Sequence, residues 1–286
     1  MLRASNWPLE WPLVAIAAAA VLYFLGGRSR AAATTAATRG REAAFYLGLL
    51  SLVLAVDSPV DAYAATLFWV HMVQHVLLMM VAPPLLLLGR PWPRIVRPFP
   101  IRLRRPVARA VLAGEPLTPV RTAARWIASP WPAFALFSTT LLVWHLPALY
   151  DLTLRDGPVH DLEHALFFTT AVLFWAHLLP SRRPQLTDVG RVAYCTAAIL
   201  VSWGLALVLA LAAEPLYGGY AGLATRPEGL SALADQQLAA GVMWVPGSVP
   251  LTIALLYAVS RWLDPAAGAP RRRRVIPAED LRPRET

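Results

Sequence analysis

Long apolar segments recur along this chain, and they constrain its fold more than any other feature. Of its 286 residues, 57% are hydrophobic. A helix needs roughly 20 consecutive apolar residues to cross the hydrocarbon core of a bilayer, and several segments reach that length. The segments are continuously apolar rather than alternating, which argues against a membrane β-barrel. The sequence therefore predicts an all-α, polytopic membrane helix bundle.

The apolar segments predict seven transmembrane helices, which form one membrane domain over residues 1–264. The first segment shows no small-residue cleavage site, so we interpret it as a span rather than as a signal peptide. The second is the shortest. The expected spans are 11–26, 43–56, 64–88, 131–149, 162–179, 189–213 and 238–262.

The placement of arginine predicts the orientation of these spans. The net charge is +9, and all 26 basic residues are arginines. With seven spans, all of them except Arg3, Arg155 and Arg226 fall on the same side of the membrane. Because cytoplasmic loops are enriched in arginine and lysine, we expect an outside N-terminus and a cytoplasmic C-terminus. Confinement of the charge to loops between spans also argues against nucleic acid as a partner.

Two cytoplasmic segments carry most of this charge. The loop 89–130 mixes arginine with apolar residues and prolines, so we expect no packed core there. We expect it instead to lie along the inner leaflet, against anionic headgroups. Residues 265–286 are predicted to form a disordered basic tail. The bilayer is thus a predicted partner, and a bacterial plasma membrane is the predicted location.

Two histidine pairs lie within the apolar segments. His71 and His75, and likewise His160 and His164, are four residues apart, which places both imidazoles of a pair on one helix face. Titratable side chains at membrane depth are costly and often mark functional sites. In the predicted topology both pairs lie in the outer half of the membrane. The sequence therefore predicts a metal ion held between helices.

Further candidate ligands fall at the same depth. His145 lies near the outer end of its span, Asp235 precedes the seventh span, and Met243 follows two turns later. Imidazole and thioether donors without a cysteine pair favour copper over zinc, and the single cysteine, Cys195, excludes a paired-cysteine motif. The carboxylate of Glu163 is a candidate to accept a hydrogen bond from a ligating imidazole, as are those of Asp161 and Asp235.

Each candidate also has a structural interpretation. A single pair of histidines four residues apart is a weak motif. His145 could hydrogen-bond the backbone that Pro147 interrupts. Met79 and Met80 are expected to pack in the core, and His177 is expected at the opposite membrane interface.

Other functions use similar residues. A b-type haem would take one axial histidine from each of two facing helices, whereas these pairs lie within single helices. A metal permease would need polar residues through the inner half of the membrane as well, where the sequence is almost entirely apolar. A membrane di-iron oxygenase would need more carboxylate or histidine ligands. The copper site is favoured over these alternatives.

At these residues the chain resembles a known family. The segment 71–91 resembles the signature of the membrane-integral CtaG-type cytochrome c oxidase assembly family. The blocks 145–164 and 235–244 resemble its second and third characteristic segments, in the expected order. The similarity extends over about residues 57–262.

The resemblance implies a seven-span protein, not an enzyme, that helps to mature a haem-copper oxidase by handling copper. It implies an oxidase subunit as partner, with an extracytoplasmic copper donor upstream. The residues that it carries over as metal-site candidates are His71, His75, His145, His160, His164, Asp235 and Met243.

Overall fold

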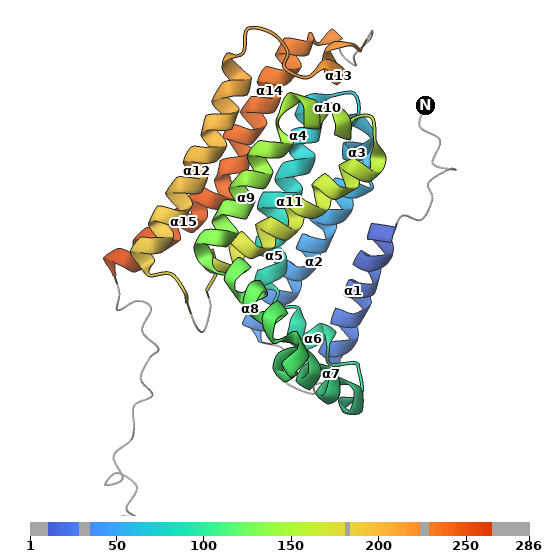
Figure 1. The fold of residues 1–286 in the computed structure, drawn as a ribbon, viewed down its shortest axis with the longest axis vertical. Coiled ribbons are helices and arrows are strands. Elements are labelled where there is room, and N and C mark those ends of the chain that lie inside the picture. Colours follow the sequence, from blue (N-terminus) through green and yellow to red (C-terminus); the bar gives the residue numbers. More distant parts are fainter. Residues whose placement is uncertain (1–10, 29–34, 181–183, 224–228, 265–286) are drawn as a thin grey trace, which may run out of the picture.

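All regular structure in the described part of the chain is helical (Figure 1). The structure, a computed structural model, describes residues 11–28, 35–180, 184–223 and 229–264. The predicted tail 265–286 lies outside the described residues, as do Arg3 and Arg226. The all-α prediction is confirmed for the ranges described.

The helices are of very different lengths. In the first half they are α1 (Trp11–Arg28), α2 (Ala36–Val56), α3 (Pro59–Ala64), α4 (Phe68–Val76), a π-helical turn (Leu77–Val81), α5 (Ala82–Leu88), α6 (Trp92–Ile95), α7 (Ile101–Ala113), a 3₁₀ turn (Glu115–Leu117) and α8 (Thr118–Ile127). In the second half they are α9 (Pro130–Trp144), α10 (Pro147–Thr153), α11 (Gly157–Leu178), α12 (Asp188–Leu211), α13 (Gly218–Ala221), α14 (Ala232–Trp244), a 3₁₀ turn (Pro246–Ser248) and α15 (Val249–Leu263).

Several helical segments are long and apolar enough to cross a membrane. Five qualify in the described residues, and a sixth qualifies if α8 and α9, bent by 71°, count as one broken span. The 22-residue helix α11 is not among them, and it carries four ionisable side chains within its first two turns: His160, Asp161, Glu163 and His164. The chain is thus a multi-pass membrane protein, whereas the count of seven and the orientation stay predictions.

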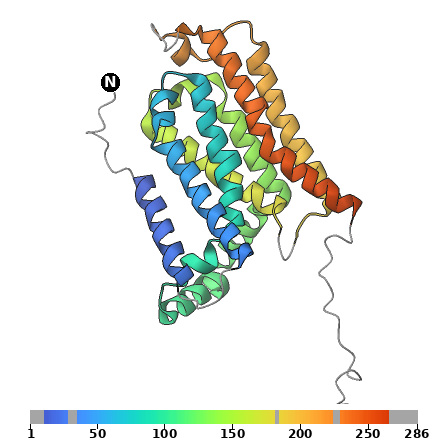
Figure 2. The same ribbon diagram turned by 180° about the vertical axis from the view of Figure 1, so that it is seen from behind.

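The helix that carries the first histidine pair, α4, lies in the middle of the bundle. It packs against α14 on one side and α3 on the other, while α11 packs against α9 and α5. Figures 1 and 2 show α12, α14 and α15 flanking this centre on one side and α1 on the other. Apolar side chains such as Leu200, Val208 and Ile253 are mostly exposed, and they suit contact with lipid tails.

The first helix is attached through a few close contacts. Tyr23 stacks on Phe45 with ring centroids 3.8 Å apart, and its hydroxyl donates to the Gly89 carbonyl at 3.0 Å. A Cβ atom at Gly26 would overlap the carbonyl of Arg94 on α6. Glycine at position 26 therefore allows α1 and α6 to touch backbone to backbone.

The third expected span, 64–88, is a continuous helix from Phe68 to Leu88 that contains a π-helical turn. It begins at Phe68 and passes through the π-helical turn before Pro83 and Pro84 open α5. Proline lacks an N–H, so Pro83 leaves the carbonyl four residues earlier, on Met79, without its usual partner. The indole N–H of Trp175 donates to that carbonyl at 2.9 Å. The span stays intact because a neighbouring helix satisfies the interrupted backbone.

The arginine-rich segment 89–130 folds into the short helices α6, α7 and α8. None of the three buries a residue, so this segment has no packed core, as its composition predicts. It lies at the end of the bundle opposite α3, α10 and α13 (Figure 1). Its contact with the inner leaflet stays a prediction.

A buried carboxylate fixes the start of α4. Leu67, at the N-cap position, has no side chain that accepts a hydrogen bond. The two oxygens of Asp235, on α14, accept instead from the backbone N–H groups of Phe68 at 2.9 Å and Trp69 at 3.0 Å. A negative group at a helix N-terminus also complements the helix dipole. Asp235 thereby fixes the axial position of α4 relative to α14.

We expect loss of this carboxylate to destabilise the bundle. In an Asp235→Ala variant two buried N–H groups lose their acceptor, at a cost of about 1–3 kcal/mol for each. Asp235→Asn keeps one acceptor oxygen and should lose less. Thermal unfolding of the detergent-purified protein should rank alanine below asparagine and asparagine below wild type. Equal unfolding temperatures for the three proteins would contradict this role.

Candidate metal centre

Five histidines from three elements meet at one point in the bundle. His71 and His75 come from α4, His160 and His164 from α11, and His145 from the end of α9. The His71 and His160 rings lie 5.2 Å apart between centroids, the His75 and His164 rings 5.6 Å, and the His75 and His145 rings 5.9 Å. The two helical pairs therefore face each other, which their spacing within each helix could not establish.

Four side chains form the tightest group. His71, His75, Glu163 and His164 each offer one ligand atom, and these four atoms lie within 4.8 Å of one another. Metal–ligand bonds of about 2.1 Å allow two ligands of one ion to lie up to about 4.2 Å apart. A tetrahedral ion would hold all four about 3.4 Å apart, so side-chain shifts of up to about 1 Å would close the group around an ion. We call these four residues the His/Glu centre.

Most donor atoms of the His/Glu centre lack a hydrogen-bond partner within the described residues. These atoms are buried Nε2 of His71, both ring nitrogens of His75, and Nε2 of His164. An unpaired buried polar atom costs about 1–3 kcal/mol, and few are left in a folded protein. Several such atoms directed at one point form an arrangement that a bound cation would stabilise.

A hydrogen-bond chain orients His71. The Tyr220 hydroxyl donates to the Ala64 carbonyl at 2.6 Å, and Nδ1 of His71 lies 2.8 Å from the same hydroxyl. Burial raises the pKa of Tyr220 well above its ordinary value, so its single hydrogen stays on the oxygen. That oxygen must then accept from Nδ1–H of His71. Neutral His71 consequently presents a bare Nε2 to the centre, which is how metal-ligating histidines are usually held.

Glu163 contributes the carboxylate of the His/Glu centre. Its Oε1 lies 3.8 Å from Nε2 of His75, beyond hydrogen-bond distance. Thr153 is the hydroxyl side chain beside the Glu163 carboxylate, and its hydroxyl donates to the Tyr150 carbonyl at 2.8 Å. The sequence suggested only a supporting role for Glu163. Its spacing of three residues from His160, which puts both on one helix face, was the signal for a place among the ligands.

The remaining predicted site residues are not members of the His/Glu centre. The His160 ring lies beside the rings of His71 and His164, with centroids 5.2 and 4.0 Å away. Both carboxylate oxygens of Asp235 accept hydrogen bonds from the backbone at the start of α4, as described above. Met243 and His145 line a separate cavity that touches the His/Glu centre only through His75. Nδ1 of His145, the C-cap residue of α9, lies 2.7 Å from the Leu141 carbonyl, so His145 hydrogen-bonds the backbone one turn earlier and not the carbonyl that Pro147 interrupts.

Two neighbouring cavities, which share Asp61, Gly157 and His160, reach the centre. One, of about 270 Å³, is lined by His71 and His160 and by the acidic side chains of Asp61 and Asp156. The other, of about 320 Å³, runs between α1 and α11 and reaches His160 and His164. Carboxylates at the mouth of a cavity raise the local concentration of cations. A metal ion could therefore reach these imidazoles without unfolding of the bundle.

We expect removal of the Tyr220 hydroxyl to weaken metal binding without removing a ligand. In a Tyr220→Phe variant His71 loses the acceptor that fixes its tautomer, and changes of this kind typically cost 10–100-fold in metal affinity. Tyr217→Phe is the matched control, because the Tyr217 hydroxyl donates to the backbone carbonyl of His145 at 3.0 Å and not to an imidazole. Competition titrations with a metal chelator measure both. Equal affinity in the two variants would show that Tyr220 does not orient a ligand.

Comparison with known proteins places this arrangement in a family. The family model of the cytochrome c oxidase caa3 assembly factor (Caa3_CtaG) matches residues 21–264. No solved structure matches the chain.

Curated relatives occur in mycobacteria. The uncharacterized protein Mb0105 of Mycobacterium bovis and the uncharacterized protein MT0111 of Mycobacterium tuberculosis are each 28% identical over 245 residues, which cover 84% of this chain and 36% of the relative. The uncharacterized protein ML1998 of Mycobacterium leprae is 24% identical over 230 residues, 78% of this chain and 34% of the relative. The chain thus spans about a third of the length of these relatives. The family match covers most of the chain, which belongs to the cytochrome c oxidase caa3 assembly factor family.

Proposed function

We propose that this protein binds copper at the His/Glu centre and passes it to a haem-copper oxidase during assembly of that enzyme. The observation that carries the proposal is the group of buried, unpaired imidazole nitrogens beside Glu163 in a member of an oxidase assembly family. The protein acts as a metal carrier in the membrane and not as an enzyme.

The donor set supports a transition metal. Three imidazoles and one carboxylate suit copper, zinc or iron, and are a poor match for magnesium or calcium, which prefer all-oxygen sites. Copper is favoured among these because thioethers from Met72 and Met243 lie in the adjoining cavity. The single cysteine, Cys195, is buried on α12 and offers no paired thiolate.

Access from one end of the bundle supports a role in transfer. The cavity lined by Asp61 and Asp156 lies near α3 and α11, away from the arginine-rich helices α6 to α8. If those helices face the cytoplasm, as the arginine distribution predicts, the opening faces outward. An extracytoplasmic donor would then deliver copper there, and an oxidase subunit in the same membrane would receive it.

The geometry favours an ion over a haem. The rings of His71 and His160 contact each other directly, with centroids 5.2 Å apart and planes at 89°. A porphyrin between two axial histidines needs a macrocycle-sized slot, so α4 and α11 would have to move apart. Bis-histidine haem ligation is therefore a weaker interpretation of this site.

Packing beyond the centre argues against a permease. Toward the arginine-rich end, Leu78, Phe137, Phe174 and Trp175 are almost completely buried. These apolar side chains close the interior, whereas an ion path needs polar groups or water along its length. The centre is accessible from one end and suits binding and release better than conduction.

We expect mutation of the His/Glu centre to weaken Cu(II) binding at that centre. His71→Ala removes an oriented ligand and Glu163→Gln removes the negative charge. Both purified variants should retain less than about a tenth of wild-type copper affinity, since even changes outside the ligands cost about tenfold. His177→Ala is the control, because His177 lies in the last turn of α11, far from the centre. Competition titrations with a chelator after Cu(II) loading measure this affinity.

The same variants test the assembly role. In a bacterium that depends on this protein for its oxidase, His71→Ala and Glu163→Gln should lower oxidase activity and oxidase copper content, and His177→Ala should not. A variant that no longer binds copper but still restores a fully metallated oxidase would contradict copper transfer. The protein would then act as a scaffold for oxidase subunits.

A further inference from the structure

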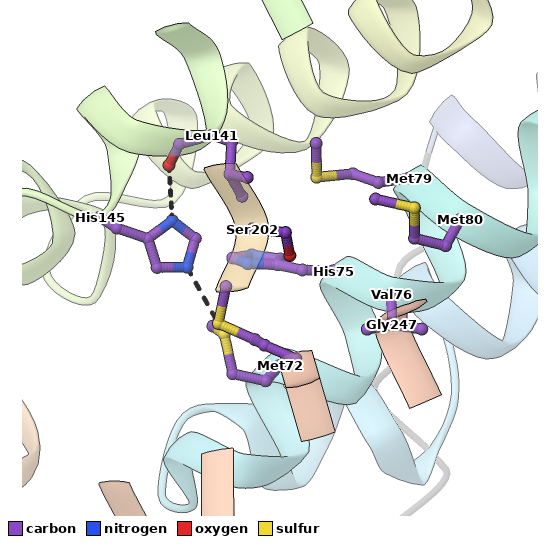
Figure 3. Close-up of a pocket in the computed structure, with 10 residues that line it drawn as sticks. Met72, His75, Val76, Met79, Met80, Leu141, His145, Ser202 and Gly247 are labelled. Carbon is purple, nitrogen blue, oxygen red and sulfur yellow. Dashed lines mark hydrogen bonds between the residues drawn. The ribbon is translucent and has the colours of Figure 1, made fainter. Parts of the chain in front are cut away.

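Four methionines line one small cavity beside the His/Glu centre (Figure 3). They come from α4, from the π-helical turn and from α14, and they are all the methionines of the chain except Met1. The cavity measures about 20 Å³, which is room for one water-sized guest. Its donor side chains are Met72, Met79, Met80, Met243, His75, His145 and Ser202.

The orientation of His145 determines what it presents to this cavity. Its Nδ1 lies 2.7 Å from the carbonyl oxygen of Leu141, which can only accept a hydrogen bond. Nδ1 must therefore carry the ring hydrogen, so neutral His145 has a bare Nε2. Metal-ligating histidines commonly donate their second N–H to a backbone carbonyl in this manner.

The bare nitrogen of His145 faces a sulfur atom. Its Nε2 lies 3.5 Å from Sδ of Met72, and Figure 3 shows the two directed at each other. A thioether sulfur has no hydrogen to donate, so two lone-pair donors oppose each other. With bonds of about 2.0 Å to nitrogen and 2.3 Å to sulfur, a tetrahedral ion holds such ligands about 3.5 Å apart. The observed separation fits one ion shared by both atoms.

A local irregularity of the helix adds to the thioether lining. The turn Leu77–Val81 is π-helical, and it buries Met79 and Met80 as well as Leu78. Such π-helical turns occur frequently at functional sites. In Figure 3 His75 lies between the Met72–His145 pair and the Met79–Met80 pair.

We propose that Met72 and His145 form a second metal site, specific for a soft monovalent ion, Cu(I). Thioether sulfur selects Cu(I) over harder divalent ions, and Met243 lines the same cavity. His75 belongs to both sites, so an ion can move from the His/Glu centre to the methionines by exchange of ligands. The proposal rests on the proposed function in taking copper as the cargo, but the two sites can be tested separately.

Paired variants and two metal probes separate the sites in the full-length, detergent-purified protein. Met72→Leu removes the sulfur at nearly constant volume, and His177→Ala, in the last turn of α11 and outside both sites, is the control. Anaerobic Cu(I) probes the thioether site, and Zn(II) probes the His/Glu centre. In Met72→Leu we expect the copper X-ray absorption spectrum to lose the sulfur neighbour. We also expect the Cu(I) affinity of this variant to fall at least about tenfold. The Zn(II) affinity of Met72→Leu should stay unchanged, and His177→Ala should keep both affinities.

The reciprocal variant completes the test. His71→Ala should lose Zn(II) but keep Cu(I) bound to sulfur, which would establish two sites. Absence of a sulfur neighbour from wild-type Cu(I) protein would overturn the proposal, as would unchanged Cu(I) binding in Met72→Leu. Loss of sulfur-bound Cu(I) in His71→Ala would overturn it as well, because it would indicate a single joint site. If the proposed function fails, the affinities for Zn(II) and copper will not depend on His71 and Glu163. The sulfur neighbour in the Cu(I) spectrum would still be present.

Discussion

A polar group buried in an apolar helix bundle must find its partner inside the protein, and this constraint organises the structure. No water is present in the hydrocarbon region to supply a missing hydrogen bond. Where the backbone is interrupted, a specific side chain compensates. Asp235 accepts from the first N–H groups of α4, and Trp175 donates to the carbonyl that Pro83 leaves open. Nε2 of His71, both ring nitrogens of His75 and Nε2 of His164 have no such compensation among the described residues, which is why a cation is the natural partner.

Two histidines are prepared for metal binding in the same way but in different surroundings. His71 donates through Tyr220 toward the Ala64 carbonyl, and His145 donates directly to the Leu141 carbonyl. In both, Nδ1 carries the hydrogen and Nε2 is free to ligate. His71 faces imidazole and carboxylate, whereas His145 faces thioether sulfur. Adjacent sites with different ligand preference would let an ion move in steps, none of which requires complete release.

The sequence predicted the elements that depend on local pattern. Apolar segments located the helices, and the four-residue spacing placed His71 with His75 and His160 with His164 on shared faces. The role of Asp235 was not predictable, because it depends on the height of α14 beside α4, which are far apart in the chain. The role of Tyr220 in orienting His71 was not predictable for the same reason. Asp235 and Tyr220 both act on backbone or side-chain atoms more than 140 residues away.

The class of metal was easier to predict from the sequence than the division of its candidate ligands between two sites. Imidazole and thioether donors indicated a soft or borderline metal, but spacing gave one mixed site containing His145 and Met243. In the structure α4 divides these donors, because His71 and Met72 are neighbours in sequence and point about 100° apart around the helix. Glu163 is in the group of ligands because, like its neighbour His164, it lies on the side of α11 that approaches α4. Sequence periodicity describes one helix at a time, whereas a metal site depends on how the faces of several helices meet.

The central claim is that one metal ion is held by His71, His75, Glu163 and His164, and anomalous diffraction from copper-loaded crystals tests it most directly. The predicted result is a peak at the copper edge about 2.0–2.2 Å from Nε2 of His71 and equally close to the other three ligand atoms. A peak only at the protein surface, or no peak with the four side chains in their present positions, would contradict it.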